Sequence, residues 1–203
     1  MANRFILASR SPRRYELLKQ MGLDFEVVPS RVEEGNLIQN ESPRDHVLRL
    51  SEAKASDVAR EYPDHWVVGA DTIVTINGMI LGKPKTHEEA LGMLGRLSGQ
   101  EHQVLSGIAV HHLSKGKADR ETVQTAVKMR TLTREEMAWY VGTGEPFDKA
   151  GAYAIQGIGS FMIESIRGSY TNVVGLPLCE LMEMLKRLGA IKITDSGIRI
   201  VER

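Results

Sequence analysis

The chain has 203 residues, enough for one large domain or two small lobes with a substantial buried core. Its 26 Lys and Arg residues balance its 26 Asp and Glu residues, which argues against broad electrostatic binding to nucleic acid or anionic membrane. No apolar run reaches the length of a membrane span, and the N-terminus lacks the pattern of a signal peptide. A single cysteine excludes an intrachain disulfide and favours a reducing, cytoplasmic setting.

The first elements are a short buried strand at residues 4–8 and a helix that begins after Ser11. Ser11 suits the N-cap position, Pro12 the first helical position, and Gly22 the position past the helix end. The sequence therefore predicts a strand, a short loop and a helix start, which is a common place for phosphate to bind.

Two cations, Arg13 and Arg14, lie in the first turn of this helix. The partial positive charge of a helix N-terminus disfavours a cation there by roughly 0.3–1 kcal/mol. One interpretation is that both arginines await an anion; the other is that both are solvated and pair with Glu16 or water. The residues alone leave these two interpretations open.

A second strand is predicted at residues 25–29, and the polar loop after it carries Glu33. Ser42 then precedes an amphipathic helix that runs to about residue 61. Lys54 lies on this helix, one position beyond the apolar Ala53, where a lysine is ordinarily solvated.

The central stretch, residues 66–84, reads WVVGADTIVTINGMILGKP and predicts a β-hairpin. Asn-Gly between two β-prone runs is a strong hairpin signal, because both turn residues must adopt positive φ angles. A two-residue loop fixes the register, so the expected facing pairs are Ile76 with Met79, Val74 with Leu81, and Thr72 with Lys83.

Asp71 lies within this apolar hairpin, where an unpaired buried carboxylate would be costly. Lys83 should share a face with Thr72, opposite to Asp71, unless a bulge at Gly82 turns Lys83 toward the carboxylate. From the hairpin alone, a strand-end Asp in a structural salt bridge is the favoured interpretation.

Two capping boxes predict two helices after the hairpin, Thr86 with Glu89 and Thr133 with Glu136. Two long strands are expected between these helices, at residues 101–113 and 120–132. The histidines of the first strand match no metal-ligand spacing, which favours structural or exposed roles.

A glycine-rich stretch at residues 142–161 carries Gln156 and lacks helical periodicity. Its glycines permit turns and close backbone approach to a ligand, although an ordinary surface loop is the alternative. A strand follows, and then a helix that starts near Pro177. In that helix Cys179 is expected to be a buried core residue, and the tail at residues 190–203 is expected to form a small hairpin of unassigned role.

Seven stretches, in one order, resemble the Maf family of nucleoside triphosphate pyrophosphatases over about residues 5–188. They are ASRSPRR (8–14), the helix with Lys54, VVGADTIV (67–74), GKP (82–84), LSGQEHQVLSG (97–107), FDKAGAYAIQGIG (147–159) and GSYTNVVGLPL (168–178). GADT together with AGAYAIQG is similar to the branch that acts on dTTP and UTP. Ser106 stands where threonine is common, a conservative difference.

The resemblance implies a mixed α/β fold, with an elongated mixed sheet flanked by helices around a central cleft, similar in shape to inosine-triphosphate pyrophosphatases. It implies one Maf-like domain of two lobes at residues 1–189, with residues 190–203 as a tail. It also implies hydrolysis of dTTP and UTP to the monophosphate and pyrophosphate, assisted by Mg²⁺ or Mn²⁺.

The resemblance further implies roles for individual residues. Asp71 matches the proton acceptor and could also hold the metal, together with Glu33. Phosphate binding is implied for Ser9, Ser11, Arg13, Arg14, Lys54 and Lys83. Substrate choice is implied for Arg13, Thr72 and Gln156. The implied partner is a nucleoside triphosphate, not nucleic acid or membrane, and a homodimer is one possible assembly.

Two rival functions belong to other classes. Maf proteins are also associated with arrest of septum formation, so a nucleotide-binding regulator without essential catalysis is the first rival. Binding alone would need the cations but no carboxylates beside them, so Asp71 and Glu33 favour hydrolysis. An RNA-binding module is disfavoured by the neutral charge and by an aromatic content of only 5%.

Overall fold

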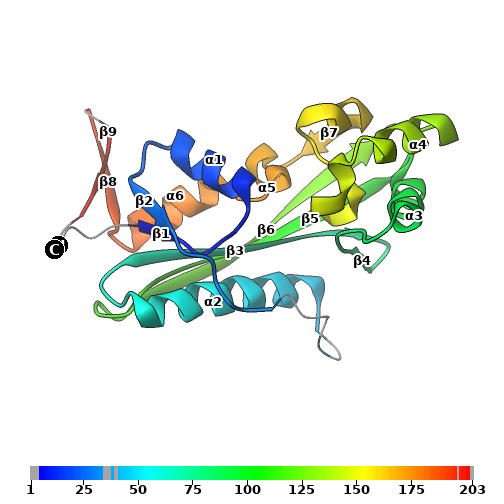
Figure 1. Cartoon of the computed structure of the whole chain (residues 1–203). Helices are drawn as coiled ribbons and strands as arrows, with labels where there is room; N and C mark the ends of the chain where they lie inside the picture. The colour runs from blue at the N-terminus through cyan, green and yellow to red at the C-terminus, as the bar shows by residue number, and fades with distance from the viewer. Residues whose placement is uncertain (1–4, 34–37, 39–40, 196, 202–203) are drawn as a thin grey trace. The chain divides into compact units, whose positions relative to one another are not determined.

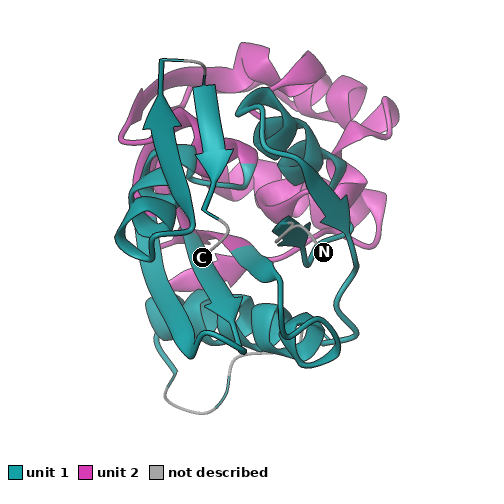
Figure 2. Cartoon of the chain, turned by 90° about the vertical axis from the view of Figure 1, so that its left-hand side faces the viewer, with its two compact units in different colours: residues 1–71, 106–123, 175–203 teal, residues 72–105, 124–174 magenta. Residues whose placement is uncertain are grey.

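The computed structural model describes residues 5–33, 38, 41–195 and 197–201. The chain divides into two compact units (Figure 2). Unit 1 comprises Met1–Asp71, Ser106–Val123 and Gly175–Arg203, and unit 2 comprises Thr72–Leu105 and Gln124–Val174. The predicted division into a domain at residues 1–189 and a tail stays a prediction.

The described residues form a seven-stranded mixed sheet with the order β2-β1-β3-β5-β6-β7, and β4 pairs with β3 (Figure 1). Strand β1 (Phe5–Leu7) is parallel to both β2 (Phe25–Val27) and β3 (Trp66–Ile76). Strands β4 (Met79–Leu81) and β7 (Ile163–Arg167) pair in antiparallel fashion with their neighbours. The predicted mixed α/β fold with helices flanking a mixed sheet is confirmed.

The helices of unit 1 cover both faces of its strands (Figure 1). Helix α2 (Pro43–Glu61) lies on one face, while α1 (Pro12–Gln20) and α6 (Leu178–Arg187) lie on the other. The contact between α2 and β3 is so close that a Cβ at Gly69 would lie 2.3 Å from the carbonyl oxygen of Ser51. Glycine is therefore required at this point of the strand.

Helix starts in unit 1 follow the sequence prediction. The hydroxyl of Ser11 caps α1 by accepting from the backbone N–H of Arg14, and that of Ser42 caps α2 by accepting from Asp45. Each cap satisfies one of the backbone donors that a helix N-terminus leaves unpaired.

The hairpin between β3 and β4 has the predicted turn, with Asn77 and Gly78 both at positive φ. Its register is also as predicted up to the pair Val74 and Leu81. The expected pair of Thr72 with Lys83 is wrong, because β4 ends at Leu81. The carbonyl of Gly82, beyond that strand, instead accepts from the backbone N–H of Gly151.

Unit 2 contains α3 (His87–Leu97) and α4 (Arg134–Gly142), which pack on one apolar core. The capping box of Thr133 and Glu136 at α4 is confirmed. At α3, Thr86 accepts from Glu89 as expected, but the Glu89 carboxylate accepts from Lys85 rather than from the cap residue.

The long strands β5 (Glu101–His112) and β6 (Lys117–Met129) have residues in both units. In the unit 2 part of β5, His102 is buried and shares a 2.8 Å hydrogen bond with the hydroxyl of Tyr153. Burial lowers the pKa of His102 to about 4, so a neutral structural ring fits its position.

The glycine-rich stretch of unit 2 is not a plain loop. It folds into three short 3₁₀ helices, η1 (Glu145–Asp148), η2 (Ala150–Ala152) and η3 (Gly157–Met162). A short helix that the sequence did not predict, α5 (Tyr170–Val174), follows β7.

The C-terminal part of unit 1 contains helix α6 and a two-stranded hairpin. Strands β8 (Ile191–Thr194) and β9 (Gly197–Ile200) form the expected hairpin. Cys179, predicted to be buried, is exposed. The buried face of α6 is made by Leu181, Met184 and Leu185, and a residue two positions before Leu181 points away from that face. Within the described residues, no helix has the length and apolar character that crossing a membrane requires.

Candidate active site

The candidate site of unit 1 is built around the pair of Asp71 and Lys54. Asp71 lies on β3 and Lys54 on α2, and each residue is only 5% exposed. The Nζ atom of Lys54 donates to Oδ1 of Asp71 across 2.7 Å. Removing two charges from water is tolerable only when they pair closely, so this contact explains how both remain buried.

Helix α2 turns Lys54 toward the strands rather than toward solvent. Leu50, Ser51 and Val58 are buried three or four positions away on the same helix, which is the spacing of one face. The expectation that Lys54 is an ordinary solvated lysine is therefore wrong, and its pairing with Asp71 brings together two residues of the predicted site.

Arg14 is buried and donates to the middle of β3 and to the backbone ahead of α6. Its Nε donates to the carbonyl of Gly175 across 2.8 Å, and its Nη1 donates to the carbonyl of Ala70 across 2.8 Å. The same Nη1 lies 3.3 Å from Oγ of Ser9. The interpretation that Arg14 is a solvated surface cation is wrong, since only 9% of the residue is exposed.

The remaining residues of the ASRSPRR motif shape the loop between β1 and α1. The hydroxyl of Ser9 accepts from the backbone N–H of Ser11 across 3.2 Å. Ser11 is occupied as the helix cap, and Arg13 is half-buried in the first turn of α1. Ser9, Ser11 and Arg14 of this motif thus each make hydrogen bonds that stabilise the local structure.

Glu33 lies exposed in the loop that follows β2. The start of this loop is tied to α2 by Asp57, whose carboxylate accepts from the backbone N–H of Arg31 and from the hydroxyl of Ser30. These bonds lower the pKa of Asp57; the Arg31 N–H contributes most, and burial opposes the shift.

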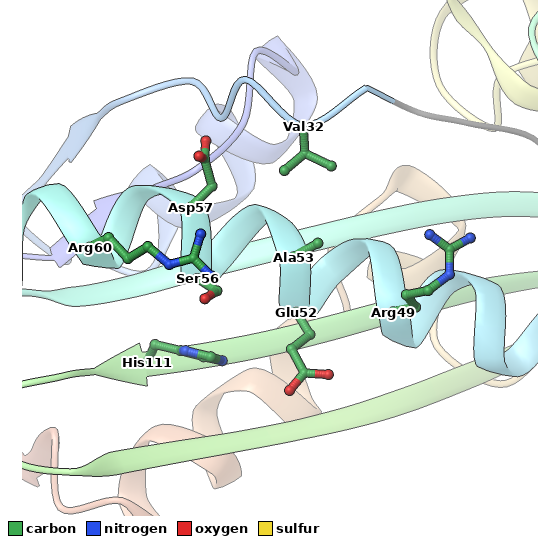
Figure 3. Close-up of a pocket in the computed structure, with 8 residues that line it drawn as sticks. All are labelled: Val32, Arg49, Glu52, Ala53, Ser56, Asp57, Arg60 and His111. Carbon is green, nitrogen blue, oxygen red and sulfur yellow. The ribbon is translucent and has the colours of Figure 1, made fainter.

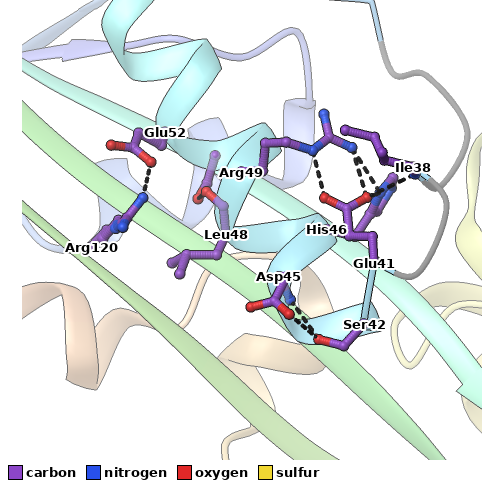
Figure 4. Close-up of polar contacts among 10 residues, drawn as sticks. Ile38, Glu41, Ser42, Asp45, His46, Leu48, Arg49, Glu52 and Arg120 are labelled. Carbon is purple, nitrogen blue, oxygen red and sulfur yellow. Dashed lines mark hydrogen bonds and ion pairs between the residues drawn. The ribbon is translucent and has the colours of Figure 1, made fainter.

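A cluster near the start of α2, which the sequence analysis missed, joins Glu41, His46 and Arg49 (Figure 4). Arg49 donates to both carboxylate oxygens of Glu41, from Nε across 2.6 Å and from Nη2 across 2.9 Å. The hydrogen bond to Glu41 raises the pKa of Arg49; burial opposes it, and the charges of Glu41 and Asp71 add to it. Arg49 is thus a further cation in the electrostatic environment of Asp71.

A pocket of about 380 Å³ borders α2 in unit 1 (Figure 3). Its lining residues are Val32, Arg49, Glu52, Ala53, Ser56, Asp57, Arg60 and His111. Several of its charges are already paired, since Arg49 binds Glu41, Glu52 binds Arg120 and Asp57 binds Ser30 and Arg31. The pocket therefore shows no clear chemical preference for a ligand.

The predicted site residues of unit 2 are more open than the buried pair of Asp71 and Lys54. Thr72 is half-buried, while Lys83 and Gln156 are exposed. Gln156 directly precedes η3, at the end of an extended stretch.

The backbone of η3 is held by Glu145. Its carboxylate accepts from the N–H groups of Ile158 and Gly159, across 3.0 and 2.9 Å, and from the hydroxyl of Tyr140 across 3.0 Å. Burial acts to raise the pKa of Glu145, but these hydrogen bonds outweigh burial and lower it. The backbone next to Gln156 is thus fixed although its side chain is exposed.

The GSYTNVVG stretch has a packing role in unit 2. Asn172 is completely buried, and its Nδ2 donates to the carbonyl of Val104 across 3.1 Å and to Oγ1 of Thr125 across 2.9 Å. The same Thr125 hydroxyl accepts from the backbone N–H of Ser169. These bonds tie α5 to β5 and β6.

Comparisons with known proteins come from sequence and from structure. A family described as Maf-like protein matches residues 4–188. A dTTP/UTP pyrophosphatase of Syntrophus aciditrophicus strain SB is 49% identical and covers 97% of this chain and 95% of its own length. One of Syntrophotalea carbinolica is 53% identical, with 94% and 87% covered. The Staphylococcus aureus Ham1 structure is 15% identical, covers 79% and 80%, and has a TM-score of 0.46, a likeness too remote to bear on function.

Proposed function

This chain belongs to the Maf family, and on that premise we propose that it is a nucleoside triphosphate pyrophosphatase acting on dTTP and UTP. Relatives of about half-identical sequence carry that name over nearly their whole length. The structural observation that carries the proposal is the buried pair of Asp71 and Lys54 at 2.7 Å. A carboxylate that a lysine holds in one position suits a group that must accept a proton from the attacking water. Nucleotide binding alone would need only cations.

The proposed reaction adds water across the bond between the α and β phosphates. One product gains the oxygen of water, the other keeps the bridging oxygen, and Asp71 accepts the proton that the water loses. Arg13, Lys54 and Lys83 would neutralise the charge that the phosphate oxygens gain. Such catalysis depends mainly on positioning and charge stabilisation, which this set of residues can supply.

We propose that Asp71 and Glu33 hold a divalent cation, Mg²⁺ or Mn²⁺, since carboxylate oxygens are the ligands that such ions prefer. Across the described residues, no group of three or more His, Cys, Asp or Glu side chains is placed to hold a metal ion. Mg²⁺ needs no such cage, because it is usually held by one or two carboxylates together with waters and substrate phosphates. When bound, it would neutralise phosphate charge; Asp71 and Glu33 are the residues proposed to hold it.

Substrate choice is proposed to depend on Arg13, Thr72 and Gln156. The exposed amide of Gln156 offers both a donor and an acceptor, which suits the O4 and N3 positions of uracil or thymine. The backbone beside Gln156 is held by Glu145, so the amide would meet the base from a defined position.

The proposed setting is the cytoplasm, where nucleoside triphosphates are made and where a lone cysteine stays reduced. The proposed partner is the substrate itself. The homodimer stays a prediction, which sedimentation of the purified protein would check.

The proposal is tested by incubating the protein with UTP, dTTP, CTP and GTP in the presence of Mg²⁺ or Mn²⁺. Pyrophosphate release from UTP and dTTP is expected, with little release of orthophosphate. Tight UTP binding without hydrolysis would instead favour the regulator of septum formation. Preference for GTP or a methylated purine would contradict the pyrimidine assignment.

A further inference from the structure

Arg14 holds two separate backbone segments of unit 1 together. Its Nε donates to Gly175, at the entry to α6, and its Nη1 donates to Ala70, near the middle of β3. The planar guanidinium presents these donors at fixed angles, so both carbonyls must lie at defined positions relative to α1.

We propose that Arg14 is a positioning residue that fixes the backbone of Asp71, rather than a ligand of the substrate phosphates. The carbonyl of Ala70 belongs to the peptide group whose nitrogen is that of Asp71. This group is planar, so a hydrogen bond to the carbonyl oxygen also fixes the direction in which the chain enters Asp71. The inference rests on the proposed function, since it takes Asp71 to be the reacting carboxylate.

Asp71 is then held from two sides. Lys54 reaches its carboxylate from α2, while Arg14 reaches the preceding carbonyl from α1. These two helices lie on opposite faces of the strands of unit 1 (Figure 1). A reacting group displaced by about 1 Å can lose on the order of a hundredfold in rate, so this double attachment has catalytic value.

The two bonds of Arg14 to backbone carbonyls disfavour the use of its Nε and of that Nη1 N–H at phosphate. The N–H groups that donate to Gly175 and Ala70 are already used, and turning them toward a phosphate would strip two carbonyls of their donors. A buried carbonyl without a donor is costly. Arg13 of the same motif, which is half-buried in the first turn of α1, is the cation proposed to neutralise phosphate charge.

The test replaces Arg14 by lysine, which keeps the positive charge but cannot reach both carbonyls in a planar fork. We expect kcat for UTP to fall by about tenfold or more, while KM and the affinity for a non-hydrolysable UTP analogue change by less than about threefold. Arg10→Lys is the matched control, because Arg10 is an exposed arginine of the same motif. It should leave all three quantities unchanged.

A double-mutant cycle separates positioning from a merely structural role. In an Asp71→Asn background, Arg14→Lys should lower kcat by less than about twofold, since the group that it positions is already inactive. Equal losses in both backgrounds would overturn the proposal. Thermal unfolding checks that each protein is folded, and Arg14→Gln gives the same comparison if the lysine variant does not fold.

Affinity for the analogue distinguishes this inference from the proposed function. A parent protein that binds the analogue but hydrolyses no nucleotide would contradict the function. In that case a tenfold or greater loss of analogue affinity in Arg14→Lys would still identify Arg14 as a phosphate ligand and overturn the inference. Unchanged affinity together with an unchanged kcat in an active enzyme would overturn it as well.

Discussion

The buried pair of Asp71 and Lys54 and the proposed base-reading residue Gln156 are held in opposite ways. In unit 1, Asp71 and Lys54 are buried and bind one another directly. In unit 2, the side chain of Gln156 is exposed, and only the neighbouring backbone is fixed, by the carboxylate of Glu145. Asp71 and Lys54 are thus fixed through their side chains, whereas Gln156 is fixed through the main chain near it.

This difference has a physical reason. A charged group that must act at one point benefits from preorganised partners, because no reorganisation is then needed during the reaction. A group that reads a base must leave its donors and acceptors open until the ligand arrives. We therefore expect substitutions of Asp71 and Lys54 to lower kcat and substitutions of Gln156 to change the choice of substrate.

The largest expected effect concerns Asp71. Asp71→Asn should lower kcat for UTP by about a hundredfold or more, because the amide cannot accept the proton from water. The fold should survive, since the amide oxygen can still accept from Lys54. Steady-state hydrolysis and thermal unfolding measure the two quantities. Asp24→Asn, at an exposed aspartate, is the control, and near-normal activity of Asp71→Asn would remove this residue from the mechanism.

The second prediction compares two cations proposed to bind phosphate, Arg13 of unit 1 and Lys83 of unit 2. It tests whether the chemistry depends on unit 1 alone. Arg13→Ala and Lys83→Ala should each cost about 2–4 kcal/mol of transition-state stabilisation, the scale for removing one preorganised donor. Values of kcat/KM for UTP give this quantity directly. Arg10→Ala and Lys85→Ala, at exposed neighbours, are the matched controls.

If Arg13 and Lys83 prove equal, the chemistry draws on both units and the comparison holds only for the base-reading residues. If both variants hydrolyse UTP like the parent, the anion-site interpretation of the ASRSPRR motif is wrong.

The sequence predicted the elements whose signals are local. The caps at Ser11 and Ser42, the turn at Asn77 and Gly78, and the capping box at Thr133 each depend on a few adjacent residues. Such local rules hold because the hydrogen bonds that they describe close within one turn of chain.

The sequence could not predict the contacts that join distant segments. Lys54 and Asp71 lie 17 positions apart, and Arg14 and Gly175 lie 161 positions apart. Nothing in a helical pattern shows that one polar residue among apolar neighbours finds a buried partner on a strand. The roles of these residues were implied by resemblance, whereas their burial and partners required the structure.

The third prediction asks whether the tight pairing of unit 1 extends to the Glu41 cluster. The hydrogen bond from Arg49 holds the pKa of Glu41 at about 2, below the ordinary 4.5; burial opposes this, and the bonds from His46 and the Ile38 N–H add to it. A carboxyl whose folded pKa is depressed contributes stability that is present above the unfolded pKa. That stability should be lost as the pH falls from about 4.5 to about 2.

Glu41→Gln should therefore lower the free energy of unfolding by about 1–3 kcal/mol at neutral pH, with the difference from the parent shrinking across that acidic window. Urea unfolding at several pH values measures it. Glu16→Gln, at an exposed glutamate of α1, should show no such dependence. A pH-independent difference would mean that the cluster acts through packing rather than charge.

The smallest expected effect is the one that most directly tests the role of unit 2. Gln156→Glu replaces an amide by a carboxylate that only accepts, so it can no longer donate to O4 of uracil. A wrong or unpaired polar contact costs roughly 1–3 kcal/mol, so we expect the ratio of kcat/KM for UTP over CTP to fall by about tenfold. CTP carries an amino group at that position, which a carboxylate can accept. General hydrolysis, followed as kcat, should change less than the ratio.

Gln20→Glu, at an exposed glutamine of α1, carries the same charge change and should leave the ratio as it is. An unchanged ratio in Gln156→Glu would exclude Gln156 from base reading, and a fall in kcat as large as that of Asp71→Asn would mean that recognition and chemistry are not held apart as the comparison states.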